Sequence, residues 1–168
     1  MLPQITEVKQ FNLVGMSFYG DPFDLHSGWD DENHIGLLWK RCMRFLRSHP
    51  EVKCQPGAAF EVHIYGDETQ EKGLFEVFVG LPIELRDAQE LPANLSLKIL
   101  PATQYAVFTF TGEQISADWE STLEEWISTS GYQACGAFNL QYYDERFKGL
   151  DQLERSVLDV YFPIKKNA

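Results

Sequence analysis

An internal repeat constrains the fold of this chain more than any other feature of the sequence. The segment AFEVHIYGD at 59–67 aligns with AFNLQYYDE at 137–145. Upstream of these segments, Trp39 aligns with Trp119 at an offset of 80 residues. Two further matches are Met43 with Leu123, and FVGLPI (78–83) with VYFPI (160–164) after removal of one residue. The repeat predicts that the two halves of the chain fold as similar units.

The spacing of apolar residues predicts a β-α-β-β order within each half. Apolar positions recur every three or four residues over 32–48 and over 116–129, as on one face of a helix. Pro50 ends the first helix, while Ser116 and Gly131 are suited to the N-cap and C′ positions of the second. Strands are predicted at 5–19, 59–65, 74–83, 95–111 with a break near Pro101, 133–143 and 156–164, with a loop from Gly66.

These elements predict an α+β fold of two pseudo-symmetric βαββ repeats that form an antiparallel sheet with two main helices. We expect a single domain, 1–168, with repeat one over about 1–90 and repeat two over about 91–168. Duplicated units commonly leave a ligand cleft between them, although the repeat could equally serve only to build a stable sheet. The aromatic content of 14% fits either a ring-lined pocket or an aromatic core.

The charge of the chain argues against direct binding of nucleic acid. The net charge is −11, whereas contact with phosphates needs Lys and Arg clustered on one face. The densest basic stretch lies within the first predicted helix and is interpreted as a solvated helix face; it consists of Lys40, Arg41, Arg44 and Arg47. An acidic surface favours cationic partners, but it also simply keeps a protein soluble.

Cysteine usage and hydropathy point to a cytoplasmic protein. The three cysteines, Cys42, Cys54 and Cys135, form no CxxC pair, which favours reduced thiols, and Cys42 on the apolar helix face is expected to be inert. We expect no signal peptide and no membrane span, because no apolar run reaches the required length. The histidines show no metal-ligand spacing, and no cofactor is expected.

Several motifs, in their order along the chain, resemble the GyrI-like, AraC-type effector-binding domain family. They are LLWKR (37–41), YAVF (105–108) followed by Gly112, Trp126 in the second helix, SGY (130–132), QYYDERF (141–147) and FPI (162–164). The resemblance covers nearly the whole chain. It implies two βαββ halves around a hydrophobic cleft that binds amphipathic small molecules, often cationic drugs or dyes.

The resemblance implies one main function and two alternatives. The main expectation is non-enzymatic binding of amphipathic, aromatic and cationic small molecules. The alternatives are a protein-interaction role such as gyrase modulation, with a possible homodimer or protein partner, and hydrolysis of reactive natural products. Many members of the family are fused to a DNA-binding domain, but this chain has no room for a helix-turn-helix unit, so we expect a stand-alone member.

One position departs from the pattern of the family. Its members often carry a buried Glu in a pattern like F-E-x-Y-D-x-R-F, and Gln141 stands at that position here. A buried carboxylate attracts an organic cation, whereas a neutral amide offers only hydrogen bonds. If the cation preference is retained, the acid must come from elsewhere, and the candidates are Glu61, Glu76 and Asp159.

Strand alternation groups the candidate binding residues onto two matching faces, one from each half. The alternative for both faces is solvated sheet surface, and for the tryptophans it is packing of the helices on the sheet. The full set expected at the cleft is Trp39, Glu61, His63, Tyr65, Glu76, Trp119, Gln141 and Tyr143. No nucleophile or phosphate-loop motif is present, and a hydrolase would have to use Glu61 with Tyr65 or Tyr143 as acid and base.

Overall fold

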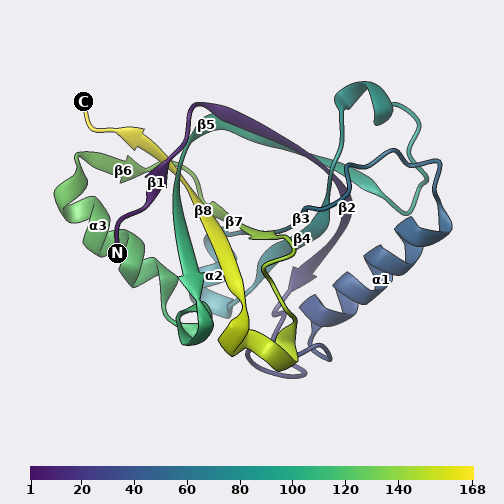
Figure 1. The fold of residues 1–168 in the computed structure, drawn as a ribbon, viewed down its shortest axis with the longest axis horizontal. Helices are drawn as coiled ribbons and strands as arrows, with labels where there is room; N and C mark the ends of the chain where they lie inside the picture. Colours follow the sequence, from purple (N-terminus) through teal and green to yellow (C-terminus); the bar gives the residue numbers. More distant parts are fainter.

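A computed structural model describes all residues, 1–168, and shows an antiparallel sheet flanked by two main helices (Figure 1). The strands of the first half are β1 (Gln4–Ile5), β2 (Lys9–Gly20), β3 (Ala59–Ile64) and β4 (Phe75–Pro82), and its helices are α1 (His34–Ser48) and α2 (Asp67–Lys72). The second half contains β5 (Ser96–Thr111), α3 (Trp119–Ser130), β6 (Tyr132–Ala134), β7 (Phe138–Tyr143) and β8 (Val157–Lys166). Short 3-10 turns lie at Leu85–Asp87, Gly112–Ser116 and Leu150–Arg155.

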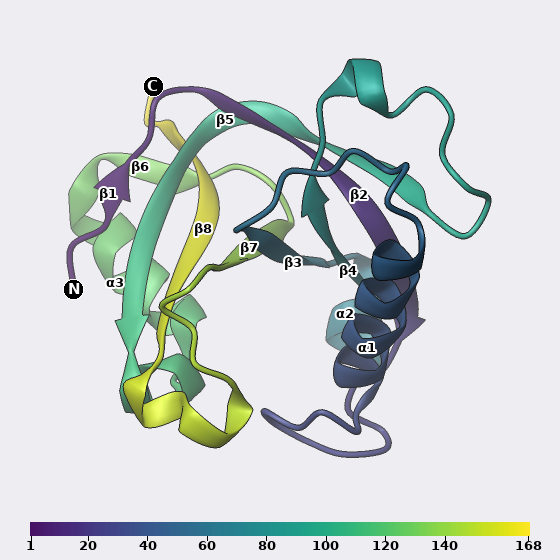
Figure 2. The same ribbon diagram turned by 45° about the vertical axis from the view of Figure 1, so that its right-hand side comes forward.

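The sheet closes on itself, because two strands near its opposite ends, β5 and β8, also pair with each other. The strand order is β1-β5-β2-β4-β3-β7-β8-β6, and an additional pairing joins β5 to β8. The first part of β5 pairs with β2 and its second part, Gln104 to Thr111, pairs with β8. Six strands therefore form a closed ring, visible as the arch of β5 and β2 over β3 and β7 in Figure 2.

The two βαββ repeats meet at β3 and β7, as the duplication predicts. Antiparallel pairing sets Val62 opposite Leu140, and the repeat also aligns these two residues. A pseudo-twofold axis therefore passes near this pair. It relates Glu61 to Asn139 and His63 to Gln141, while the register sets Glu61 directly opposite Gln141 and His63 opposite Asn139. The predicted α+β fold class is confirmed.

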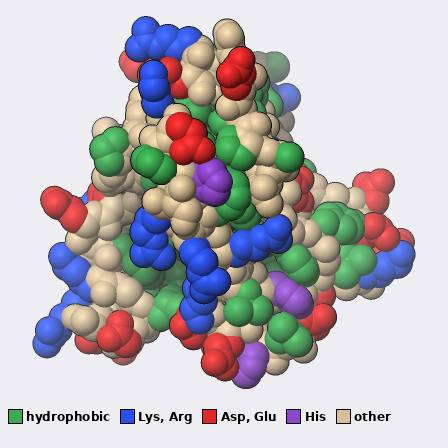
Figure 3. Space-filling model, turned by 90° about the vertical axis from the view of Figure 1, so that its right-hand side faces the viewer, with side chains coloured by type: hydrophobic (Ala, Val, Ile, Leu, Met, Phe, Trp, Pro, Cys, Tyr) green, Lys and Arg blue, Asp and Glu red, His purple; other side chains and the backbone are tan.

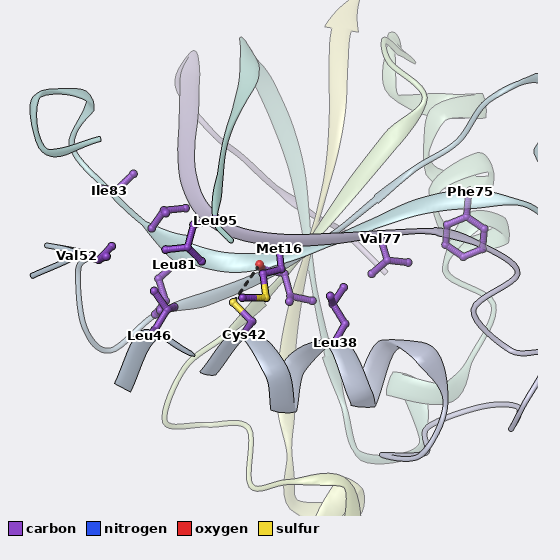
Figure 4. Close-up of a cluster of buried hydrophobic side chains, with 12 residues drawn as sticks. Met16, Leu38, Cys42, Leu46, Val52, Phe75, Val77, Leu81, Ile83 and Leu95 are labelled. Carbon is purple, nitrogen blue, oxygen red and sulfur yellow. Dashed lines mark hydrogen bonds between the residues drawn. The ribbon is translucent and has the colours of Figure 1, made fainter. Parts of the chain in front are cut away.

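Each main helix packs its apolar stripe against the sheet. Helix α1 buries Leu38, Cys42 and Leu46 against strands of the first half (Figure 4). Burial raises the pKa of the Cys42 thiol to about 11, so this cysteine stays protonated and unreactive at neutral pH. Helix α3 packs Leu123 in a separate cluster with residues of β5 and β8. On the other sheet face, a third cluster includes Phe11 and Phe60.

Several details of the predicted elements are wrong, and the first is that the strand predicted over 5–19 is split into β1 and β2. Asp118, whose Oδ1 accepts the backbone N–H groups of Glu120 and Ser121, caps α3 in place of Ser116. The predicted loop after Gly66 contains α2, and the strand predicted over 133–143 is broken between β6 and β7. Strand β5 continues through Pro101, where a register shift against β2 accommodates the proline. Gly131 is confirmed as the left-handed residue that ends α3.

The basic stretch on α1 lies on the outer surface, as predicted. Figure 3 views the side of the molecule that lies at the right in Figure 1, and Lys and Arg side chains gather near its centre. Arg41, Arg44 and Arg47 are exposed, as is Lys40, which pairs with Asp31 at 2.8 Å. None of the helices is both long and apolar enough to cross a bilayer.

Candidate functional site

A cavity of about 590 Å³ lies over the centre of the sheet, between α1 and the beginning of α3. Strands β3 and β7 form its floor, and Figures 1 and 2 show the two helices on either side of these strands. Residues of the loop before α1 and of the loop after β7 complete the wall, among them Trp29 and Phe147. Cavities of this size suit drug-sized ligands.

The centre of the floor is the carboxylate of Glu61, which is only 4% exposed. Trp39 donates its indole N–H from α1 to Glu61 Oε2 at 2.7 Å. On the other oxygen, His63 Nε2 lies 2.6 Å from Glu61 Oε1. A carboxylate offers about four acceptor positions, so two remain for a ligand. Glu61 is thus fixed in orientation and still able to accept.

The opposite half of the floor is built from neutral groups. Tyr143 donates its hydroxyl to Gln141 Oε1 at 2.7 Å, and Gln141 Nε2 lies 3.3 Å from His63 Nε2. Next to them, Asn139 Nδ2 donates to the hydroxyl oxygen of Tyr65 at 2.9 Å. Polar side chains therefore lie side by side across β3 and β7, although His63 Nε2 donates to Glu61 and so cannot also accept a hydrogen bond from Gln141.

Burial keeps both floor tyrosines neutral. Removal from water raises the pKa of Tyr143 well above its usual value, and the nearby charge of Glu61 raises it further. Burial also raises the pKa of Tyr65 to about 12; the hydrogen bond from Asn139 opposes this shift, and Glu120 and Glu61 reinforce it. At neutral pH both phenols therefore offer hydroxyl groups and uncharged ring faces.

Aromatic rings form the walls above this polar floor. The Trp39 ring meets Tyr143 edge-on with centroids 5.6 Å apart, and Tyr143 meets Phe147 at 4.8 Å. Trp29 lies 6.1 Å from Trp119 and 6.2 Å from Phe147. The cavity can therefore bury a flat apolar molecule and present ring faces to a positive charge.

The charge of the cavity lining is strongly negative. Five carboxylates line it, namely Glu61, Asp30, Asp31, Asp118 and Glu120. Lys40 is the single lysine of the lining, and it is paired with Asp31. The lining contains no arginine. The lining therefore carries negative charge both at the entrance of the cavity and at its floor.

The structure brings together seven of the eight residues expected at the cleft and leaves one outside. The cavity is lined by Trp39, Glu61, His63, Tyr65, Trp119, Gln141 and Tyr143. Glu76 does not line it; this residue of β4 pairs with Lys98 at 2.7 Å. Asp159, the third candidate acid, is paired with Arg146 at 2.6 Å and also lies outside. Of the candidate acids, Glu61 alone faces the cavity.

Sequence reasoning missed Asn139, Trp29 and Phe147. Asn139 carries a signal that could have identified it, because the repeat aligns it with Glu61. Trp29 and Phe147 lie in loops, where no periodicity indicates the direction of a side chain.

Metal ligands are sparse around the cavity. His26, Asp30 and Glu32, in the loop before α1, hold ligand atoms within 4.8 Å of one another. His26 and Glu32 are exposed, and the His26 nitrogens lie 3.7 Å from Asp30 and 3.8 Å from Glu32. This group is outside the floor network and adds to the acidic entrance.

The sequence of this chain is similar to part of a curated transcriptional regulator. A curated relative, the transcriptional regulator BrlR of Pseudomonas aeruginosa, is 29% identical over 170 residues. The alignment covers 98% of this chain and 56% of BrlR, so the chain spans about half the length of that relative.

Solved structures share the fold. The C-terminal domain of EcmrR has a TM-score of 0.71 at 15% identity, covering 99% of this chain and all of that one. SAV2435 bound to tetraphenylphosphonium has a TM-score of 0.66 at 15% identity, covering 98% of this chain and 94% of that one. A hydrolase encoded by lin2189 from Listeria innocua has a TM-score of 0.57 at 10% identity, and the match covers 98% of this chain and 92% of that one.

The family itself is established by sequence. The model of the GyrI-like small molecule binding domain matches residues 1–165, nearly the whole chain. The motifs around LLWKR and QYYDERF and the two βαββ repeats agree with this match. The chain therefore belongs to the GyrI-like small molecule binding domain family.

Proposed function

We propose that the domain binds amphipathic, aromatic cations without transforming them. The observation that carries this proposal is the buried Glu61 carboxylate at the floor of an aromatic-lined cavity. Desolvation of a cation is costly unless an opposite charge compensates it at close range. Glu61 is already buried and held by Trp39 and His63, so little of the site has to be ordered when the ligand enters.

Ligand size and selectivity follow from the lining. The cavity volume suits molecules with several aromatic rings, which would stack against Trp39, Tyr143 and Phe147. The acidic entrance would attract cations over anions of the same shape. SAV2435, which shares this fold, was solved with tetraphenylphosphonium bound, and this supports the choice of a lipophilic cation as the probe.

The biological role we propose is ligand-dependent regulation in the cytoplasm. BrlR is a transcriptional regulator in which a region similar to this chain makes up about half of the protein. Free thiols at all three cysteines are consistent with a reducing compartment. In this role ligand binding would act on a DNA-binding partner. The domain would not contact DNA directly, because it is acidic.

A charge-matched ligand series tests the binding proposal. Tetraphenylphosphonium should raise the melting temperature of the domain and quench tryptophan fluorescence, while neutral triphenylphosphine oxide should bind more weakly and tetraphenylborate should not bind. Glu61→Gln should weaken the phosphonium about a hundredfold, as expected for loss of a buried charge partner. Glu76→Gln is the matched control and should bind normally. Equal binding of cation and neutral analogue would refute the proposal.

A hydrolytic function is the second candidate, because a carboxylate, an imidazole and two phenols converge on one cavity floor. A solved protein with this fold from Listeria innocua is described as a hydrolase. In such a reaction Glu61 or His63 would activate water as a general base. Turnover of a strained electrophile that disappears in Glu61→Gln would favour this candidate, and recovery of unchanged ligand after incubation would exclude it.

A further inference from the structure

One buried polar atom of the cavity lacks a partner. Asn139 is 4% exposed and lines the cavity, and its Nδ2 donates to the Tyr65 hydroxyl at 2.9 Å. Its Oδ1 accepts no hydrogen bond, and it is the one buried side-chain nitrogen or oxygen in the protein with none. Buried acceptors without donors are rare and costly, so this atom calls for an explanation.

The duplicated architecture shows why the donor is missing. Glu61 is the pseudo-twofold mate of Asn139, and Glu61 receives the indole N–H of Trp39. The repeat aligns Trp39 with Trp119, but Trp119 is the first residue of α3 and donates its N–H to the Gln114 carbonyl oxygen at 3.3 Å. The second half therefore holds an acceptor at the position equivalent to Glu61, with the matching donor turned away.

The surroundings of Asn139 restrict what can supply the donor. None of the neighbouring floor groups donates to Asn139 Oδ1: Asn139 Nδ2 donates to Tyr65, and the Tyr143 hydroxyl donates to Gln141 Oε1. Asn139 lies opposite His63 across the strand pair and is a diagonal neighbour of Glu61, at roughly 7–8 Å between backbone positions. A donor must therefore come from within the cavity, from water or from a ligand that spans both positions.

We propose that Asn139 is a specificity-determining residue whose Oδ1 accepts an N–H or O–H group of the ligand. The inference rests on the proposed function, because the same ligand places its positive charge near Glu61. It narrows the ligand class from lipophilic cations in general to those that carry a hydrogen-bond donor able to reach Asn139 when the positive charge lies near Glu61. Fully alkylated cations leave the acceptor unsatisfied, whereas primary and secondary amines satisfy it.

Two triarylmethane dyes form a suitable pair of probes. Pararosaniline carries amino N–H groups, and crystal violet has the same skeleton and charge with every amine methylated. We expect the wild-type domain to prefer pararosaniline. Asn139→Leu should weaken pararosaniline about tenfold and change the affinity of crystal violet less than about twofold. Equal effects on both dyes, or no effect on pararosaniline, would overturn the inference. A preference for ligands that carry acceptors in place of donors would also overturn it.

Two further variants separate this inference from the proposed function and from misfolding. Glu61→Gln should weaken both dyes, and binding of both dyes unchanged by Glu61→Gln would refute cation recognition irrespective of Asn139. The double variant Tyr65→Phe/Asn139→Leu removes both members of the hydrogen-bonded pair. In the absence of ligand it should melt at or above the temperature of the wild type, because an unpaired buried acceptor is gone. A clear fall in melting temperature would show that Oδ1 contributes to the fold and not to ligand choice.

Discussion

The two halves of the cavity floor share a backbone but differ in chemistry. In the first half β3 presents Glu61 and His63, and in the second half β7 presents Asn139 and Gln141 at the equivalent positions. Tyr65 and Tyr143 are the third equivalent pair. Duplication therefore fixed the frame of the site, and subsequent divergence placed the floor's negative charge in one half only.

The difference shows how a symmetric fold can carry an asymmetric site. Two carboxylates at the equivalent positions 61 and 139 would repel each other across a poorly solvated floor. Each of them would also need its own hydrogen-bond donors. Here the Trp39 indole and the His63 ring both contact the single carboxylate, Glu61. The second half presents the uncharged amides of Asn139 and Gln141 instead. The cationic ligand that we propose would fit such a floor in a single orientation.

Moving the negative charge of the floor from the first half of the chain to the second should produce the largest effect on ligand affinity. The double variant Glu61→Gln/Asn139→Asp places the carboxylate on β7 where no tryptophan donates to it. We expect tetraphenylphosphonium affinity to fall about a hundredfold relative to wild type, because the charge is no longer held at the original position. Calorimetric titration measures this, with Asn139→Asp alone as the control that retains Glu61. Wild-type affinity in the double variant would mean that the position of the charge is unimportant.

The second largest effect should be a difference in stability between variants of Trp39 and of Trp119. Trp39→Phe removes an N–H from a buried carboxylate and should cost about 1–3 kcal/mol in urea unfolding, together with weaker cation binding. Trp119→Phe loses a 3.3 Å hydrogen bond to the backbone carbonyl of the exposed Gln114, which leaves no buried charge without a donor, and should cost about 0.5 kcal/mol. Equal losses in the two variants would contradict the view that only one half holds a charge that needs a donor.

Much of this arrangement could be predicted from the sequence, because it depends on the internal repeat and on the alternation of side chains along each strand. The repeat indicated two βαββ units, and the period of two placed Glu61, His63 and Tyr65 on one face. Glu76 was misplaced because its face depends on the register between β3 and β4. That register sets Glu61 opposite Val79, so Glu76 lies on the other face of the sheet.

The parts that could not be predicted depend on contacts between distant residues. Asn139 was overlooked because only the hydrogen-bond partners reveal that one of its atoms is unpaired. The sequence aligns Trp39 with Trp119, but α3 begins at Trp119 whereas α1 begins five residues before Trp39. The equivalent tryptophans therefore occupy different turns and donate to different acceptors.

The floor tyrosines predict how stability responds to alkali. The pKa of each tyrosine in the folded protein lies above its unfolded value, so the contribution of both to stability is complete below about pH 10 and falls at higher pH. For Tyr65 this contribution is lost as pH rises toward about 12. Tyr143→Phe should therefore make the fall in unfolding free energy above pH 10 less steep. Urea titrations at several alkaline pH values measure this slope, and an unchanged slope would show that Tyr143 ionises as freely as an exposed tyrosine.

Substitution of Glu76 should have the smallest effect on stability and on cation affinity. It is a useful comparison with Glu61, because the sequence alone makes the two residues equal candidates for the acid of the cleft. Glu76 and Lys98 form a partly exposed pair with side chains 28% and 25% accessible. Such pairs contribute about 0.5 kcal/mol, so Glu76→Gln should lower the melting temperature by about 1–2 °C and leave cation affinity unchanged. Lys98→Gln should have the same small effect if the pair is the cause. A loss of cation binding in Glu76→Gln would mean that charge acts through the sheet, and not through the contacts of Glu61.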